Sequence, residues 1–208
     1  MSIYIIRHGR TIWNAEGKIQ GSLNSPLLPE SIETSRKIGE LLVCSGIKNI
    51  FCSPLQRCLE TANTISEILE CSYTNDARIS ECNHGLCEGL THAEAREKYG
   101  AELSLRDTDK WNIPYPEGES YADVFARAKS FADDMKTNEG VLIIAHEMFN
   151  KCLIGYIIKW SPEEIIKFKQ PNSIVAKIDF ENRSLELVDS ALYRNPLHGF
   201  KACPLRSR

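Results

Sequence analysis

The chain has 208 residues, of which 42% are hydrophobic and 25% are charged. These proportions are typical of a globular protein and exclude a disordered or fibrous chain. The formal net charge of −3 disfavours a protein that binds nucleic acid through a basic surface. Every apolar run is much shorter than the about 20 residues of a membrane-spanning helix. We therefore expect neither nucleic acid nor membrane among its partners.

The N-terminus and the cysteines both indicate a cytoplasmic protein. The first residues, Met1 to Ile6, lack a basic segment and a long apolar core, so we expect no secretory signal. The eight cysteines include no Cys-x-x-Cys pair. A chain of this length does not need disulfides to fold, and we therefore expect reduced thiols.

The first part of the chain predicts a strand, a long loop and a helix. Residues 3–6 are an apolar run typical of a buried strand, and the run stops at Arg7-His8-Gly9. Residues 10–29 are polar and interrupted by glycines and prolines, which predicts a loop of the length that usually carries function. Residues 30–45 then show apolar side chains at helical spacing.

A second strand is predicted at residues 49–52, and a helix should begin directly after it. The following segment, Ser53-Pro54-Leu55-Gln56, has the residue types of an N-cap, a first helical position and a capping box. Arg57 would then lie in the first turn of this helix.

In the second part of the chain, predicted helices continue to alternate with predicted strands. Helices are predicted at residues 91–99, at 121–135, at 147–158 and after the capping box at 161–164. Residues 141–145 are an apolar run that stops at His146 and predicts a third buried strand. The runs at 174–180 and 185–188 predict a hairpin. The tail at 190–208 is basic and irregular.

Strands that alternate with helices predict an α/β fold: a three-layer sandwich with a mostly parallel central sheet flanked by helices. We expect residues 1–208 to form a single domain. In such sheets ligands bind beyond the carboxyl ends of the strands. Arg7, His8, Arg57 and His146 all follow predicted strands, so we expect them at one edge of the sheet.

These side chains suit a phosphate group. Two guanidinium groups and a helix N-terminus bind anions, and a neutral imidazole can attack phosphorus. Arg7 and Arg57 should lower the pKa of His8 and keep it neutral. A carboxyl group is also needed to protonate the leaving oxygen, and Glu81 and Glu88 are the candidates.

Five motifs occur in an order that resembles one known family. They are Arg7-His8-Gly9 with Asn14 and Gln20-Gly21, Ser53 to Ala62, Ile79-Ser80-Glu81 with Gly85 and Glu88-Gly89, Pro116 to Ser120, and Ile143 to His146. Together they resemble the histidine phosphatase superfamily, the phosphoglycerate mutase-like group, over residues 2 to about 160. The resemblance implies the fold of that group.

The resemblance also implies a role for each matching residue. His8 would be the phosphorylated nucleophile, and Glu81 would be the acid and base. Arg7, Arg57 and His146 would hold the phosphoryl oxygens. The loop residues that would contact the phosphate are Asn14, Gln20 and Gly21. Neither a metal ion nor another cofactor is expected.

Some positions depart from the family pattern. Glu147 stands where the family usually has glycine, and its carboxylate could face solvent, perturb His146 or disfavour an anionic substrate tail. Cys87 stands where tryptophan is frequent, and the segment 27–29 lacks a common Thr or Ser.

The other histidines, His84, His92 and His198, are interpreted as surface or local structural residues. The tail cations Lys201, Arg206 and Arg208 could close over an anionic substrate.

We therefore predict a metal-independent phosphatase that hydrolyses small phosphomonoesters through phospho-His8. A cofactor-dependent phosphoglycerate mutase is the alternative. Only 34 residues separate Glu81 from Pro116, whereas such mutases usually carry a longer insertion there, which favours hydrolysis. A non-catalytic phosphate-binding protein of the same fold is a third hypothesis. The expected partner is a small phosphorylated metabolite of unspecified identity, and a homodimer is compatible with the sequence.

Overall fold

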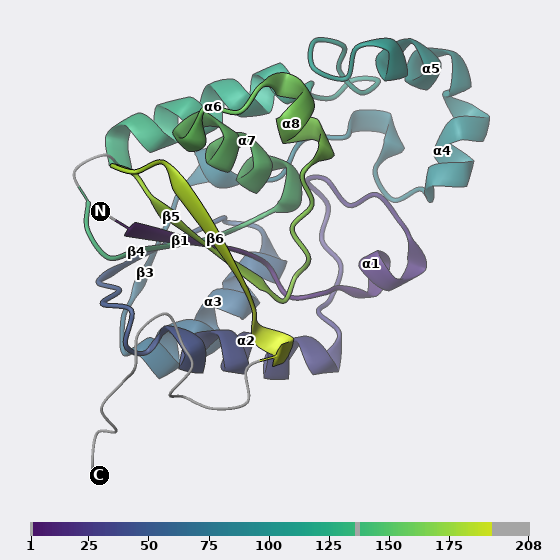
Figure 1. The fold of residues 1–208 in the computed structure, drawn as a ribbon. Helices are drawn as coiled ribbons and strands as arrows, with labels where there is room; N and C mark the ends of the chain where they lie inside the picture. Colours follow the sequence, from purple (N-terminus) through teal and green to yellow (C-terminus); the bar gives the residue numbers. More distant parts are fainter. Residues whose placement is uncertain (1, 136–137, 193–208) are drawn as a thin grey trace.

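Figure 1 shows a computed structural model of the chain, which describes residues 2–135 and 138–192. Its strands are β1 (Ser2–Arg7), β2 (Asn49–Cys52), β3 (Tyr73–Asn75), β4 (Val141–Ala145), β5 (Ile174–Asp179) and β6 (Ser184–Asp189). They form one sheet in the order β3-β2-β4-β1-β5-β6. The strands β3, β2, β4 and β1 pair in parallel, and β5 and β6 pair antiparallel to their neighbours. The predicted, mostly parallel sheet is confirmed.

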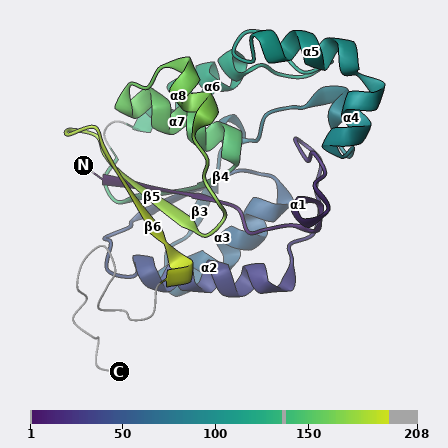
Figure 2. The same cartoon turned by 45° about the vertical axis from the view of Figure 1, so that its right-hand side comes forward.

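Helices cover both faces of this sheet (Figure 1). They are α1 (Ile12–Glu16), α2 (Pro29–Leu42), α3 (Gln56–Leu69), α4 (His92–Lys98), α5 (Gly100–Thr108), α6 (Tyr121–Met135), α7 (Glu147–Ile158) and α8 (Pro162–Lys167). The helices α2 and α3 lie on one face, while α6 and α7 lie on the other, which gives the three predicted layers. Figure 2 places α1, α4 and α5 together beyond the carboxyl end of β1.

Side-chain alternation along the central strands builds the two apolar layers. Ile3 and Ile5 of β1 join the core that includes the buried faces of α6 and α7. Tyr4 and Ile6 point the other way and join the core with α2 and α3. Because successive side chains of a strand alternate between faces, a strand buried on both sides is apolar at nearly every position.

One predicted helix start is wrong and another is confirmed. Helix α3 begins at Gln56 with Leu55 as its N-cap and without a side-chain capping bond. Ser53 lies two residues before this N-cap; its hydroxyl accepts from Leu55 N at 3.4 Å and is hydrogen-bonded to His146 Nε2 at 2.8 Å. Ser161 caps α8 in a complete capping box, as predicted. The strand β3, the helix α5 and the helix α1, which lies inside the predicted loop at 10–29, are additional elements.

The cysteines and the surface add two observations. Among the described residues, six cysteines are free, namely Cys52, Cys58, Cys71, Cys82, Cys87 and Cys152. Cys44 is disulfide-bonded, which corrects the prediction of reduced thiols at that position.

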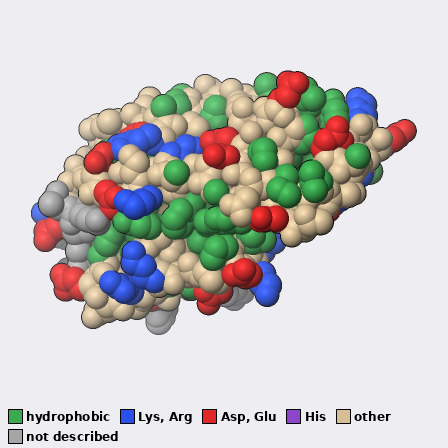
Figure 3. Space-filling model, turned by 90° about the horizontal axis from the view of Figure 1, so that it is seen from above, with side chains coloured by type: hydrophobic (Ala, Val, Ile, Leu, Met, Phe, Trp, Pro, Cys, Tyr) green, Lys and Arg blue, Asp and Glu red, His purple; other side chains and the backbone are tan. Residues whose placement is uncertain are grey.

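Acidic and basic side chains are interspersed on the face viewed from above in Figure 3, and no histidine is visible there. None of the described helices is long and apolar enough to cross a membrane.

Candidate active site

The carboxyl ends of β1, β4 and β2 lie side by side and bring the predicted residues together. His8 N donates to Ala145 O and Ser53 N donates to Ile144 O, both at 3.0 Å, so the parallel pairing continues just past the strand ends. As a result the His8 and His146 rings lie with their centroids 5.2 Å apart. The predicted convergence at one edge of the sheet is confirmed.

A cavity of about 320 Å³ opens at this edge. Seven of the eight predicted site residues line it, namely Arg7, His8, Asn14, Gln20, Gly21, Arg57 and Glu81. The eighth, His146, is fully buried and is not part of the cavity lining. Its ring packs against the ring of His8, which does line the cavity.

His8 is held with one ring nitrogen free. Its Nδ1 lies 2.7 Å from Gly9 O, and because a carbonyl oxygen only accepts, Nδ1 carries the proton. Nε2 of the neutral ring therefore keeps its lone pair. Burial, followed by the positive charges of Arg7 and Arg57, lowers the pKa of His8 well below the usual 6.5. The imidazole is neutral at physiological pH and is suited to nucleophilic attack.

Arg57 both shapes the loop and faces the cavity. Its two terminal nitrogens donate to Leu23 O and Gly21 O, each at 2.7 Å, and the side chain is almost completely buried. The Nε atoms of Arg57 and Arg7 are buried without a hydrogen-bond partner among the described residues. An unsatisfied buried donor is costly, so an anion is the partner that these two guanidinium groups lack.

Helix α3 fixes Arg57 relative to the strand that carries His8. Thr61, one turn later, donates its hydroxyl to Arg57 O at 2.7 Å. The same hydroxyl oxygen accepts from Gly9 N at 2.9 Å. A single threonine thus joins the start of α3 to the end of β1. It thereby fixes the position of Arg57 relative to His8.

His146 offers a second neutral imidazole. Burial first, and then the charges of Arg57, His8 and Arg7, lower its pKa well below the usual value. Because the Ser53 hydroxyl can donate to Nε2, the ring can carry its proton on Nδ1. Nδ1 is buried and has no partner within the described part of the chain. The ring is thus left with an unpaired, buried donor next to His8.

The carboxyl group of Glu81 is held at the cavity wall. Its Oε1 accepts from Cys82 N at 2.9 Å and from Met148 N at 3.2 Å. Glu88 has a different position, because its Oε1 accepts from Ser22 N and His84 N and joins two loops outside the cavity lining. This geometry favours Glu81 over Glu88 as the acid and base.

Asn14 of α1 and the loop residues Gln20 and Gly21 line the cavity close together in sequence. Asn14 Oδ1 accepts from Thr11 N, which leaves its amide nitrogen available. Gln20 Nε2 donates to Thr11 Oγ1 at 2.8 Å. Gly21 has φ +52°, and a Cβ there would lie 1.9 Å from Glu88 Oε1, so only glycine fits without displacing that carboxylate.

Glu147 points neither away from the site nor at His146. Its Oε2 lies 2.8 Å from Arg7 NH1, and its Oε1 lies 3.5 Å from Lys151 Nζ and 3.7 Å from Lys169 Nζ. All four side chains line the cavity. The spacing of Glu147 and Lys151, four residues apart on one helix, was a signal for this contact.

His84 and His92 were interpreted as surface or local structural residues, and the structure places both in the cavity wall. Burial lowers the pKa of His84 to about 4. Tyr115 packs edge-on against His84 and lines the same wall.

The predicted residues His198, Lys201, Arg206 and Arg208 lie outside the described residues. Within those residues no three His, Cys, Asp or Glu side chains gather as a metal site.

Comparison with known proteins identifies sequence relatives. A family described as the histidine phosphatase superfamily (branch 1) matches residues 3–192. The chain is 32% identical over 179 residues to 6-phosphofructo-2-kinase/fructose-2,6-bisphosphatase 4 of Rattus norvegicus, and 31% identical to the corresponding protein of Gallus gallus. In both cases the match covers 85% of this chain and 37% of the relative, so the chain spans little more than a third of these proteins.

Solved structures share the fold. A putative alpha-ribazole-5'-P phosphatase from Escherichia coli superposes with a TM-score of 0.83 at 21% identity, covering 91% of this chain and 95% of that one. A mycobacterial glucosyl-3-phosphoglycerate phosphatase in complex with VO3 superposes with a TM-score of 0.77 at 22% identity, covering 89% and 96%. At these identities the likeness concerns the fold.

Proposed function

Since the chain belongs to the histidine phosphatase superfamily (branch 1), we propose that it hydrolyses small phosphomonoesters without a metal ion, through a phosphohistidine on His8. One observation carries this proposal. The free Nε2 of a neutral His8 faces a cavity beside two buried arginine Nε donors that lack a partner among the described residues. A phosphoryl group supplies both the electrophile and the missing acceptor.

The first step transfers the phosphoryl group to the enzyme. His8 Nε2 attacks phosphorus, the ester P–O bond breaks, and the leaving oxygen takes a proton from Glu81. Arg7, Arg57 and the Nδ1–H of His146 stabilise the charge on the phosphoryl oxygens. The products are phospho-His8, the free alcohol and an ionised Glu81.

The second step returns the enzyme to its starting state. Ionised Glu81 accepts a proton from a water molecule, whose oxygen attacks phosphorus. The P–N bond to His8 breaks and inorganic phosphate leaves. Arg7 and Arg57 supply in both steps the positive charge that other phosphatases take from metal ions.

The cavity wall supports a polar, phosphorylated metabolite of sugar size. Beyond the phosphate side it carries hydrogen-bonding groups, including those of His84, His92 and Tyr115. A cavity of about 320 Å³ accommodates a small metabolite. Hydrolysis is favoured over the mutase alternative because the relatives reported above are named as phosphatases or bisphosphatases. The presence of both His8 and Glu81 at the cavity disfavours a non-catalytic role.

A sugar bisphosphate is a second candidate substrate. The rat and chicken relatives are named fructose-2,6-bisphosphatases. Arg106 is 4% exposed, stacks 3.9 Å over the Tyr115 ring, and has two buried nitrogens without a hydrogen-bond partner among the described residues. Arg106 does not itself line the cavity, so it would act by holding the Tyr115 ring, and by placing its positive charge behind that ring, where a second phosphate would bind.

The deciding experiment measures hydrolysis of p-nitrophenyl phosphate in excess EDTA by the wild type and by His8→Ala. We expect turnover that survives EDTA and disappears in the variant, with an acid-labile, alkali-stable phosphoenzyme in the wild type. Activity that EDTA abolishes would overturn the metal-free mechanism. Fructose 2,6-bisphosphate is the second substrate. Arg106→Gln should slow its hydrolysis and leave that of p-nitrophenyl phosphate unchanged.

The cellular location belongs to the same proposal. Six of the seven described cysteines are free and one, Cys44, is disulfide-bonded; the predominance of free thiols supports a reducing compartment, and we place the protein in the cytoplasm. Cell fractionation followed by immunodetection tests this placement.

A further inference from the structure

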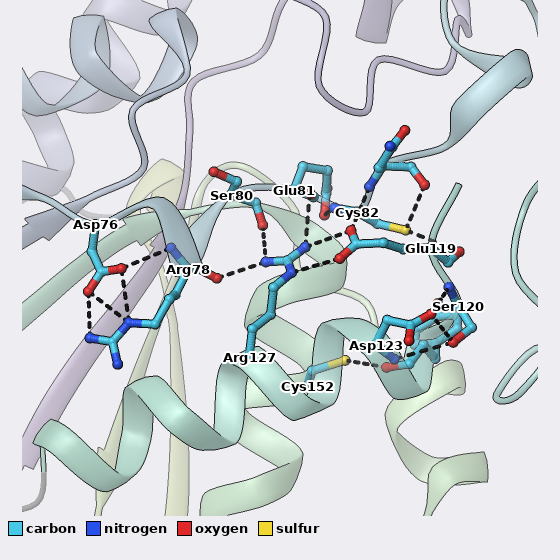
Figure 4. A network of polar contacts seen from close by, with 12 residues as sticks. Asp76, Arg78, Ser80, Glu81, Cys82, Glu119, Ser120, Asp123, Arg127 and Cys152 are labelled. Carbon is cyan, nitrogen blue, oxygen red and sulfur yellow. Dashed lines mark hydrogen bonds and ion pairs between the residues drawn. The ribbon is translucent and has the colours of Figure 1, made fainter. Parts of the chain in front are cut away.

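Arg127 of α6 forms a network next to the candidate active site (Figure 4). Its Nε and NH2 donate to the two carboxylate oxygens of Glu119, each at 3.0 Å. NH1 donates to Arg78 O at 2.8 Å and to Ser80 O at 2.6 Å. NH2 also donates to Glu81 O at 3.0 Å. These five hydrogen bonds use all five N–H donors of the guanidinium group.

Glu119 extends the network to the other side of Glu81. Its Oε2 accepts from Asn83 N at 2.8 Å, and its backbone N donates to Asn83 O at 2.7 Å. Arg127 and Glu119 together therefore bind the backbone before, at and after Glu81. Glu119 belongs to the motif at Pro116 to Ser120, for which the proposed mechanism has no other use.

The backbone held in this way has no other regular support. Residues 81–84 belong to neither a helix nor a strand. The loop that carries Glu119 approaches so closely that a Cβ on Gly118 would lie 2.4 Å from Asn83 O. Ser120 caps α6 through Asp123, which fixes this second loop to the helix that carries Arg127. The backbone that carries Glu81 is thus fixed from α6, while Met148 N of α7 holds the carboxyl group itself.

We propose that Arg127 and Glu119 are positioning residues for Glu81 in proton transfer to the leaving group, an inference that rests on the proposed function. Neither side chain lines the cavity, so neither contacts the substrate. General acid catalysis requires the acid within hydrogen-bond distance of the leaving oxygen, and an error of about 1 Å can cost about 100-fold in rate. Loss of the network should therefore slow the step that needs a proton and spare a step that does not.

The test compares two leaving groups in single turnovers with enzyme in excess. Glyceryl phosphate releases an alkoxide that needs a proton, whereas 2,4-dinitrophenyl phosphate releases a stable phenolate. We expect Arg127→Gln and Glu119→Gln to slow alcohol release from glyceryl phosphate by about 10- to 100-fold. Release of dinitrophenolate should change by less than about threefold, because general acid assistance is then unnecessary. Glu81→Gln should show the same asymmetry.

Arg78→Gln is the matched control. Arg78 lies on the same segment, but its side chain pairs with Asp76 and Asp134 and does not contact Glu81. Both leaving groups should depart from this variant at wild-type rates. The near-isosteric Glu119→Gln keeps the measurement possible if Arg127→Gln fails to fold.

The outcomes separate this inference from the proposed function. Equal slowing of both substrates, or no slowing of glyceryl phosphate, would show that the network is only structural and would overturn the inference. A wild type that hydrolyses neither substrate and forms no phospho-His8 would instead remove the proposed function itself.

Discussion

Glu147 and Arg7 form an ion pair, with Glu147 Oε2 lying 2.8 Å from Arg7 NH1 at the edge of the cavity. Arg7 is one of the two guanidinium groups proposed to hold the phosphoryl oxygens. A bound phosphate and the Glu147 carboxylate therefore compete for the same positive charge. Lys151 and Lys169 lie within 3.7 Å of Glu147 Oε1. They can remain paired with the Glu147 carboxylate when Arg7 binds the phosphate instead.

Glu147→Gln should accordingly strengthen the binding of anions. We expect the inhibition constants of inorganic phosphate and vanadate to fall about fivefold, which corresponds to about 1 kcal/mol for a partly exposed charge pair. Competitive inhibition assays at fixed ionic strength measure this change. Glu163→Gln, an exposed carboxylate at the start of α8, is the control. Unchanged constants for Glu147→Gln would mean that the ion pair does not oppose phosphate binding.

Arg57→Lys should be severely damaging although it preserves the charge. Arg57 binds two loop carbonyl groups with its terminal nitrogens and keeps a third donor, Nε, buried and unpaired, and the single nitrogen of lysine cannot replace all three. Loss of two charge-assisted hydrogen bonds predicts a decrease in kcat/KM of at least about 100-fold. Arg36→Lys changes an exposed arginine of α2 and should be silent. Wild-type kinetics in Arg57→Lys would contradict the proposed phosphate site.

The strand-end residues were predictable because their positions follow from sheet geometry. Apolar runs marked β1, β2 and β4, and parallel strands bring the residues after their carboxyl ends to one edge. The lowered pKa of His8 was also predicted from Arg7 and Arg57, but its largest cause is burial, which depends on the packing of several elements.

Other parts of the site depend on contacts between distant segments. Ser53 has the residue type of an N-cap, yet its hydroxyl is engaged by His146, 93 residues away in the sequence. Lys169 contacts Glu147 from the segment after α8. Arg127 binds backbone carbonyl groups, which every residue has, so the residue types at those positions do not reveal the contact. His84 and His92 were interpreted as surface or local structural residues; His92 is exposed and His84 is partly buried, and their place in the cavity wall depends on packing that residue type does not reveal.

The pH dependence of the first chemical step should reflect the lowered pKa of His8. Only the neutral ring attacks phosphorus, so activity is lost as the pH falls through the pKa of His8 in the folded enzyme. Because burial and the two arginines hold this pKa well below 6.5, protonation of His8 should not reduce kcat/KM as the pH falls from 7 to just below 6.5. Arg7→Gln removes one of the two charges and should move the acidic limb to higher pH. An acidic limb centred at or above 6.5 in the wild type would contradict this assignment.

The same buried histidines should make the fold sensitive to acid. His8, His146 and His84 all have pKa values lowered in the folded state, the last to about 4, whereas in the unfolded chain each titrates near 6.5. Below pH 6.5 the unfolded chain therefore binds more protons, and the free energy of unfolding decreases as the pH falls. Each such histidine contributes a slope approaching about 1.4 kcal/mol per pH unit between its two pKa values.

Urea unfolding monitored by circular dichroism between pH 7.5 and pH 5 measures this slope, and His84→Gln isolates one contribution to it. His84 packs edge-on against Tyr115 at a centroid distance of 4.5 Å, so the substitution should lower stability at pH 7.5 through lost packing. The deficit should then shrink as the pH falls, because the variant has no buried imidazole to keep neutral. A deficit that stays constant over this range would show that His84 titrates alike in the folded and unfolded chains.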